Sequence, residues 1–366
     1  MRVEREIAGF AFPFAAAVVA AVLTGGSPCI INPTYHSLAL MVTLSSALVL
    51  LHPARRSWEP YVQWGLIIIC ALACGSFMGI SGTEMEISAI HSGGWLSRAT
   101  EQAGARMGAL IDSIAFEDET TNGIIKALLT GDRSGITAQT AEMFRSSGAS
   151  HILALSGLHL GIIYGIVSKL LSVTGNSKIS RQLKSVSIML LCGLYTLATG
   201  AGASITRAYI FIVVKETAEM TGRHASLKSV LGVSLMLHLA FDPSAAADVG
   251  FQLSYAAMFG IAYIYPYLKN IWRSSWKGLG WIWQSAALSI SCQLTTGPLA
   301  YYYFGTFPQY FLLTNLLALP LAGIIIPSGL ITVALTAIGC CPDVLVELTE
   351  WMTQALAHAL EVISAM

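Results

Sequence analysis

Long apolar runs separated by short polar connections make up most of this chain. Each run is long enough, or nearly so, to form a helix across the roughly 30 Å of hydrocarbon in a bilayer. The runs lie near residues 10–23, 35–51, 62–80, 151–171, 184–200, 226–241, 249–268, 281–300, 310–338 and 345–366. Only 11% of the 366 residues are charged, whereas a soluble domain usually has about 25%. The sequence therefore predicts an all-α integral membrane protein, a polytopic bundle of roughly ten transmembrane helices.

Three regions are predicted along the chain. They are a three-helix membrane region at 1–80, an extracytoplasmic helical segment at 81–150 and a polytopic transmembrane domain at 151–366. In the second region, apolar residues within 95–114 recur at three- and four-residue steps, which predicts an amphipathic helix. Shorter helices at 123–130 and 138–147 are expected to follow it. In the third region, Pro320 and Pro327 interrupt the longest run, which predicts a broken or kinked helix.

The positions of lysine and arginine predict the orientation of the chain. The N-terminus and the second connection carry Arg2, Arg5, Arg55 and Arg56, and the positive-inside rule places such segments in the cytoplasm. This arrangement requires the weaker run 204–221 to cross the membrane as well. The formal net charge is zero, so overall charge gives no argument for a nucleic-acid partner. No Cys/His spacing resembles a zinc site, and we expect neither a metal nor a cofactor.

Polar side chains lie in and beside the apolar run 151–171. They are Arg145, His151, Ser156 and His159. A charged side chain at the bilayer centre costs roughly 2.5–3.5 kcal/mol, so polar groups within such helices usually face a cavity and serve a pathway. This segment is therefore the first candidate for a functional site.

Ser156 and His159 are three residues apart, which would place them on one helix face. A Ser–His pair is able to serve acyl transfer, and the alternatives are hydrogen bonds between helices or the lining of a pore. Gly157, Gly161 and Gly165 follow each other at steps of four, and such a strip lets another helix approach closely. The segment thus predicts a face for helix packing beside a polar face.

Three arginines are predicted on the outer side, where together they would form a cationic entrance. They are Arg133, Arg145 and Arg207. Phosphate backbones are bound through such contacts without reading of the bases. Arg207 shares a helix face with Ser204 and is alternatively an anchor that reaches the membrane surface. Asp132 is interpreted as a turn-stabilising residue, with acid catalysis as the alternative.

Two further groups are candidates for lining a path. Gln252 and Ser254 are two residues apart and would point in roughly opposite directions, so at most one of them lines a given cavity. An aromatic cluster follows the run 281–300, and it consists of Tyr301, Tyr302, Tyr303, Phe304 and Phe307. An aromatic belt at the membrane interface explains this cluster, and stacking of unpaired bases is the alternative.

Several of these motifs resemble the ComEC family of bacterial competence channels. The matching elements are Leu128–Gly135, Phe144–Gly148, His151–His159, Ser204–Ala208, Gly250–Tyr255 and Asn315–Pro320, in the family's order. The resemblance covers about 95–335, and its most specific part is Ser156-Gly-Leu-His159 with the upstream arginine. It implies a multi-pass channel in the bacterial inner membrane that passes single-stranded DNA into the cytoplasm during natural transformation.

The chain differs from the fullest members of that family in two ways. It leaves no room near 81–95 for their outer OB-like domain, and it contains no metallo-β-lactamase-like nuclease motif. A separate nuclease is therefore expected, beside single-stranded DNA, membrane lipid, DNA-receptor or pilus components and a cytoplasmic DNA motor or helicase; the oligomeric state stays open. The alternative functions are an intramembrane hydrolase that uses Ser156 and a histidine, and a small-solute transporter, which a broken helix would suit.

Overall fold

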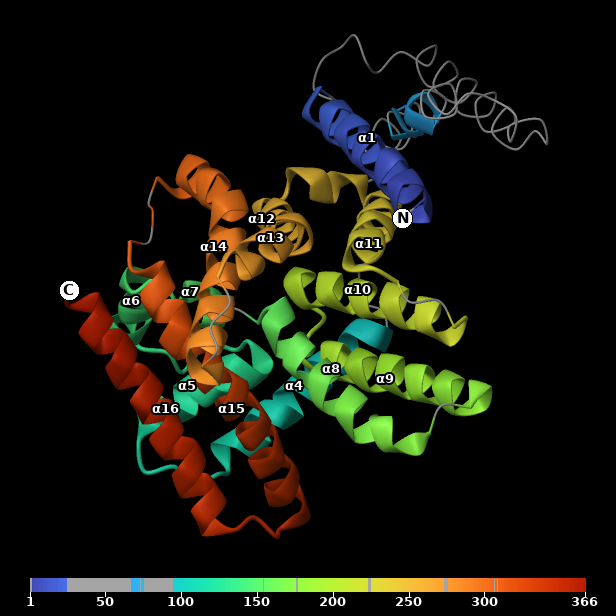
Figure 1. Cartoon of the computed structure of the whole chain (residues 1–366). Helices are drawn as coiled ribbons and strands as arrows, with labels where there is room; N and C mark the ends of the chain where they lie inside the picture. The colour runs from blue at the N-terminus through green and yellow to red at the C-terminus, as the bar shows by residue number, and fades with distance from the viewer. Residues whose placement is uncertain are drawn as a thin grey trace. The chain divides into compact units, whose positions relative to one another are not determined.

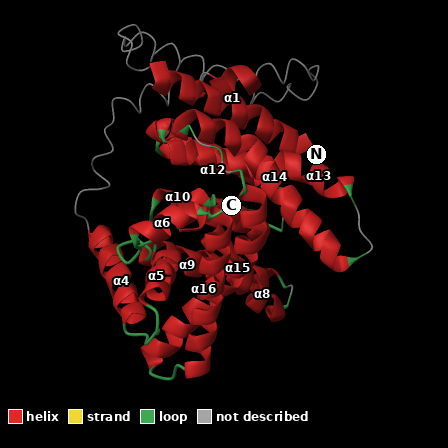
Figure 2. Ribbon diagram, turned by 90° about the vertical axis from the view of Figure 1, so that its left-hand side faces the viewer, coloured by secondary structure: helices red, strands yellow, loops and turns green. Residues whose placement is uncertain are grey.

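The computed structural model describes most of the chain, and every regular element in the described part is a helix (Figure 2). The described residues are 2–24, 67–72, 74–75, 95–153, 155–175, 177–222, 225–272, 276–305, 307 and 309–366. Two compact units share the chain. The first consists of Met1–Ser92 and Gly222–Tyr263, and the second of Gly93–Thr221 and Ile264–Met366.

The first unit is built on the N-terminal helix. Its elements are α1 (Arg2–Thr24), α11 (Leu227–Phe241), η4 (Pro243–Ala247), α12 (Val249–Phe259) and most of a π-helical turn (Gly260–Ile264). Phe14 and Val18 of α1 pack against Leu235 and Leu239 of α11, and all four side chains are buried. Removing these side chains from water is the main force that joins the two helices.

The second unit contains the remaining helices. They are α4 (Trp95–Asp112), α5 (Glu119–Thr130), α6 (Ala138–Ser146), α7 (Ser150–Leu153), α8 (Gly157–Leu170), η3 (Leu171–Thr174), α9 (Lys178–Ala198), α10 (Ala203–Met220), α13 (Tyr265–Ile271), α14 (Lys277–Phe304), α15 (Phe311–Ile338) and α16 (Asp343–Ser364). The helices predicted within 95–114, 123–130 and 138–147 are all present, as α4, α5 and α6.

Two hydrophobic cores lie within the second unit. In one, α5 is surrounded by α15 and α16, which run side by side (Figure 1). Leu128, Ile325 and Leu356 are fully buried representatives of these three helices. In the other core, α8, α9 and α10 meet through Leu160, Ile188 and Ile205. The chain therefore gathers α8, α9 and α10 into one three-helix layer.

The predicted helix at 151–171 is interrupted in the structure. Helix α7 ends at Leu153 and α8 begins at Gly157. Ser156 has extended backbone angles, φ −123° and ψ 170°, and its side chain caps the second helix. A serine is favoured at this position because its hydroxyl accepts an otherwise unpaired backbone N–H. The prediction of one continuous span was wrong because the apolar residues around Ser156 conceal a helix start.

Helix α15 departs from the prediction in the opposite direction. It runs without a break over 28 residues, although Pro320 and Pro327 lie inside it. Each proline removes only one backbone N–H from the helical ladder. Close to the second proline, the Ser328 hydroxyl donates to the Ile325 carbonyl at 3.0 Å, and the Thr332 hydroxyl donates to the Ser328 carbonyl at 2.8 Å. The predicted break is therefore absent, and a kink at the prolines stays a prediction.

Among the described residues, α15 is the one helix both long and apolar enough to cross a membrane. Three apolar helical stretches are shorter, namely Gly9–Ala20, Gly157–Leu170 and Leu227–Phe241. The prediction of roughly ten membrane-spanning helices is therefore not confirmed. The predicted span 35–51 and most of 62–80 lie outside the described residues. The division into regions 1–80, 81–150 and 151–366 stays a prediction.

Candidate functional site

Ser156 and His159 form the N-terminal cap of α8. The Ser156 hydroxyl accepts the backbone N–H of Leu158 at 3.3 Å. In return, Nδ1 of His159 accepts the backbone N–H of Ser156 at 3.1 Å. This reciprocal arrangement is a capping box, with a histidine in the place where glutamate or glutamine is usual. The two residues were predicted to share a helix face. In the structure Ser156 instead lies just before α8 as its N-cap, and this position brings it to His159.

The cap limits what the Ser–His pair is able to do chemically. Ser156 Oγ lies 3.1 Å from His159 Nδ1, which is hydrogen-bond distance. The same nitrogen also accepts the Ser156 backbone N–H, so it already serves as an acceptor in the cap. His159 is fully buried, and its Nε2 has no hydrogen-bond partner among the described residues. The pair therefore has a structural task, and a third group that would orient the histidine for catalysis is not seen in the described part.

The three glycines of α8 differ in their surroundings. A Cβ added at Gly157 would lie 3.3 Å from the Cβ of Ala208, so α10 approaches closely there. At Gly161 and Gly165, an added Cβ would meet no atom of the described residues within 4 Å. Of the predicted strip, only Gly157 is thus placed against a neighbouring helix.

Asp132 and Arg133 lie in the turn between α5 and α6. Gly131 ends α5 with φ of 78°, a conformation that favours glycine. The Ser134 backbone N–H donates to Asp132 Oδ1 at 2.9 Å. This bond is the main cause that lowers the pKa of the Asp132 carboxyl below its ordinary value. Arg133 is exposed in the same turn.

Arg145 and His151 are both at the surface. The Arg145 side chain is 76% exposed, and its guanidinium lies 2.9 Å from Glu142 one turn earlier on α6. Such an exposed pair is worth only about 0.3–0.5 kcal/mol. His151 Nδ1 donates to the Gly148 carbonyl at 3.1 Å, which fixes the ring beside the α6–α7 turn. Both side chains are accessible to a partner.

Arg207 differs from the other two arginines because it is buried, with an exposed fraction of 7%. It lies in the first turns of α10, where Ser204 is half-buried. The remaining two candidates belong to the first unit. There Gln252 donates to the Ala246 carbonyl at 2.9 Å, and Ser254 is half-buried on α12. The predicted site residues thus differ in their burial, and they belong to both units.

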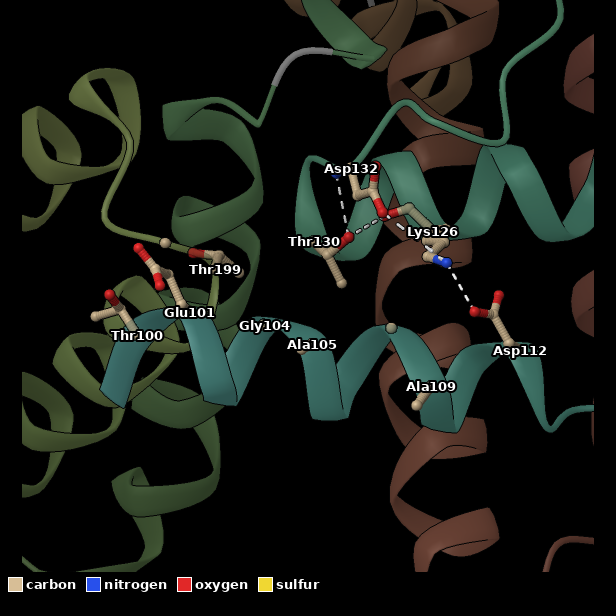
Figure 3. Close-up of a pocket in the computed structure, with 12 residues that line it drawn as sticks. Thr100, Glu101, Gly104, Ala105, Ala109, Asp112, Lys126, Thr130, Asp132 and Thr199 are labelled. Carbon is tan, nitrogen blue, oxygen red and sulfur yellow. Dashed lines mark hydrogen bonds and ion pairs between the residues drawn. The ribbon is translucent and has the colours of Figure 1, made fainter. Parts of the chain in front are cut away.

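A pocket of about 380 Å³ lies between α4, α5 and the α9–α10 connection (Figure 3). Its lining residues are Thr100, Glu101, Gly104, Ala105, Gly108, Ala109, Asp112, Lys126, Thr130, Asp132, Thr199 and Gly200. Lys126 Nζ lies 2.7 Å from Asp112 and 3.9 Å from Asp132. Together with Glu101, three carboxylates and one ammonium group line the pocket. This excess of negative charge disfavours the binding of a polyanion. Of the predicted site residues, the pocket is lined by Asp132 alone.

Two buried glutamates were not predicted as site residues. Glu216 of α10 is 4% exposed and accepts hydrogen bonds from Tyr164 and Ser185. Glu350 of α16 is 7% exposed and accepts the backbone N–H groups of residues 117 and 118. For Glu216 the sequence does give one signal. The residue lies inside the otherwise apolar run 204–221, where a carboxylate is costly unless it has partners.

The comparisons with known proteins agree with the order of these elements. Residues 128–366 match the family of competence proteins, from the last residues of α5 to the C-terminus. The chain belongs to the competence protein family. The matched part contains the turn at Asp132, the Ser156–His159 cap, Arg207 and both glutamates that sequence reasoning missed.

A curated relative supports this family membership. The chain is 28% identical over 200 residues to ComE operon protein 3 of Bacillus subtilis (strain 168). The aligned part is 55% of this chain but 24% of that protein, so the chain spans about a quarter of its relative's length. No solved structure matches the chain.

Proposed function

We propose that this chain acts in DNA uptake during competence, as a channel in the bacterial inner membrane that passes single-stranded DNA to the cytoplasm. The observation that carries the proposal is the match to the competence family over residues 128–366. The resemblance to ComEC, which rests on the motifs around Asp132 and Ser156, supports the same function.

An exposed apolar stripe supports a membrane location. On α9, large apolar side chains at three- and four-residue steps are exposed, namely Ile179, Leu183, Val186, Leu190 and Leu194. This spacing places them on one face of the helix. A contiguous apolar face of this kind marks contact with lipid or with another protein. Since most of the chain is apolar, lipid is the partner that fits this face best.

The aromatic residues of α14 support the same location. Trp276 and Trp281 are exposed at its start, and Tyr301 and Tyr302 are exposed at its end. Trp281 and Tyr301 are twenty residues apart, which is about 30 Å along a helix. This length equals the thickness of the hydrocarbon, and aromatic side chains gather at both of its surfaces. The aromatic cluster at 301–307 therefore fits a membrane interface better than a platform for bases.

The exposed arginines are the groups best placed for the phosphates of a strand. Arg133 and Arg145 lie on the turns at the two ends of α6. A phosphate is able to replace Glu142 beside Arg145 at little cost, because an exposed ion pair is weak. Contacts of this kind hold a strand without reading its bases, and weak repeated contacts let it move on.

Deletion and complementation test the proposal directly. In the native host, cytoplasmic arrival of labelled DNA should be lost without this chain and restored by the full chain. Binding of DNA at the cell surface is the control, and it should be unchanged. Normal cytoplasmic arrival in the deletion strain would exclude the proposed function.

A further inference from the structure

The turn that follows α6 carries Arg145 and closes the helix as a Schellman motif. Gly148 has φ of 81°, the left-handed conformation that favours glycine in this motif. Its N–H donates to the Arg145 carbonyl at 3.1 Å, and the Ala149 N–H donates to the Phe144 carbonyl at 2.8 Å. Phe144 and Ala149 are fully buried in the core that contains α5, α15 and α16. The exposed Arg145 therefore lies on a turn whose two ends are buried.

One carbonyl of this turn has a donor from a distant part of the chain. The Thr314 hydroxyl, near the start of α15, donates to the Ser147 carbonyl at 2.6 Å, and the two residues are 167 positions apart. Both residues are fully buried. Ser147 is the C-cap of α6, and the carbonyls at a helix C-terminus have no partner within the helix. The Thr314 hydroxyl therefore satisfies a buried carbonyl at the end of α6.

The backbone of the turn is held from two sides, while the side chain of Arg145 is free to meet a ligand. Thr314 bonds the Ser147 carbonyl from α15, and His151 of α7 bonds the Gly148 carbonyl at 3.1 Å. The Arg145 side chain itself is 76% exposed. The position of its guanidinium is therefore set mainly by the backbone of the turn.

Loss of the Thr314 hydroxyl would act on this position. A buried carbonyl without a donor costs free energy comparable to a lost hydrogen bond. The turn borders solvent at Ser146, which is exposed. An outward movement of the turn would bring the Ser147 carbonyl to water, and Arg145 lies only two residues before it. The hydroxyl that satisfies the carbonyl thus also determines where Arg145 lies.

We propose that Thr314 is a positioning residue, which holds the α6–α7 turn where Arg145 contacts a phosphate of the DNA strand. The inference rests on the proposed function, because that function supplies the strand. It gives a role to a residue of α15 that the sequence did not single out. A hydroxyl that only stabilised the fold would have different effects in the experiments that follow.

The salt dependence of DNA binding tests the positioning role. The full chain in lipid nanodiscs would be titrated with labelled oligothymidylate at several salt concentrations. Each phosphate contact to a single strand contributes about 0.7 to the slope of log K against log salt. Arg145→Ala should reduce the slope by about this amount, and so should Thr314→Val, which removes only the hydroxyl function. Thr314→Ser, which keeps the hydroxyl, should retain the wild-type slope. An unchanged slope in either Arg145→Ala or Thr314→Val would overturn the proposal.

A second buried threonine of α15 provides the matched control. The Thr332 hydroxyl donates to the Ser328 carbonyl of its own helix at 2.8 Å, and Thr332 is fully buried as well. Thr332→Val should therefore keep the wild-type slope, although it also removes a buried hydroxyl. A slope that falls equally in both valine variants would show a general effect on the fold and overturn the positioning role.

Double variants show whether Thr314 acts through Arg145. Thr314→Val combined with Arg145→Ala should have the slope of Arg145→Ala alone, because the contact is already lost. Combined with Arg133→Ala, on the turn at the other end of α6, its effect should add, since distant and independent sites are additive. Additive effects of Thr314→Val and Arg145→Ala would overturn the proposal.

DNA uptake in complemented cells connects this contact to the function. Thr314→Val should reduce cytoplasmic arrival of labelled DNA several-fold at an equal amount of chain in the membrane, and Thr314→Ser should restore it. Wild-type uptake by Thr314→Val would overturn the positioning role and leave the proposed function standing. Normal uptake in the deletion strain would instead remove the proposed function itself.

Discussion

Glu216 and Glu350 are both buried carboxylates in helices of the same unit, but their donors differ. Glu216 accepts two side-chain hydroxyls, from Tyr164 and Ser185. Glu350 accepts two backbone N–H groups, those of Glu117 at 3.2 Å and Asp118 at 2.9 Å, and a longer bond of 3.4 Å from the Gln354 side-chain amide. A backbone N–H only donates, whereas a hydroxyl both donates and accepts. The two carboxylates are therefore equally buried but are held by different kinds of donor.

The second carboxylate has a clear structural task. Asp118 is the N-cap of α5, and Glu350 holds the two residues before that helix against α16. A negative charge near a helix N-terminus is also favoured by the helix dipole. Glu350 thus fixes the start of α5 to α16 through backbone donors, whereas Glu216 is held by side-chain hydroxyls.

Paired amide substitutions should show the largest difference in stability. In Glu350→Gln, the side-chain NH₂ would face a backbone N–H, so we expect the loss of one charge-assisted bond, about 2–3 kcal/mol of unfolding free energy. In Glu216→Gln, the NH₂ would face the Ser185 hydroxyl, which is able to accept it, so the loss should stay below about 1 kcal/mol. Thermal unfolding of both variants in the same detergent measures this difference. Equal losses would remove the distinction between the two sites.

Replacement of Ser156 tests the N-terminal cap of α8, where a side chain also accepts a backbone N–H. Ser156→Ala leaves the Leu158 N–H without its acceptor, and the expected loss of stability is about 1 kcal/mol. Uptake of DNA should change little, because the hydroxyl caps a helix. Ser156→Thr, which keeps the hydroxyl, is the matched control. Complete loss of activity in a stable Ser156→Ala variant would instead favour the hydrolase.

Arg145 extends the comparison to an exposed ion pair. Arg145→Ala should lower the unfolding free energy by less than about 0.5 kcal/mol, because Glu142 is its exposed partner. We expect DNA uptake to fall several-fold in this variant, since a phosphate contact is removed, and to fall less in Arg145→Lys, which keeps the charge. Uptake should be scored against the amount of chain in the membrane. Normal uptake by Arg145→Ala would count against a strand path over this turn.

Asp132 should show the smallest effect, and only at certain pH values. Its carboxylate accepts the Ser134 N–H in the folded state, so its folded pKa lies below the unfolded value. The stabilisation is therefore present above the ordinary pKa of an aspartate and is lost as the pH falls through the folded pKa. Asp132→Asn should lower the melting temperature slightly at neutral pH and should match the wild type in strong acid. A difference independent of pH would contradict this origin.

The sequence predicts helix content better than helix limits. Apolar periodicity correctly predicted α4, because burial of one helix face requires it. The apolar runs at 184–200 and 345–366 overlap α9 and α16. The start of α8 was missed since Ser156 lies within an apolar run, although serine followed three residues later by a side chain that bonds back is a start signal. The prolines of α15 predicted a break, but the helix continues through both of them and packs against α16.

The contacts of the buried polar groups could not be predicted from the sequence, and the reason is physical. Glu216 meets Tyr164 and Ser185 only after three helices have packed, and no local pattern fixes such a contact. The motif residues Arg133, Arg145 and Arg207 could be recognised by type, but their exposure could not. Two of them are exposed, and Arg207 is buried.

Electrical recording across a planar lipid bilayer tests the central claim, a hydrated path for a polyanion, most directly. Applied voltage then drives the strand, so that no motor protein is needed. With the full chain inserted, we expect an ionic current and transient blockades when single-stranded DNA is added on one side, more frequent at higher voltage. Current no greater than that of lipid alone, or current that DNA never blocks, would contradict a strand-conducting channel.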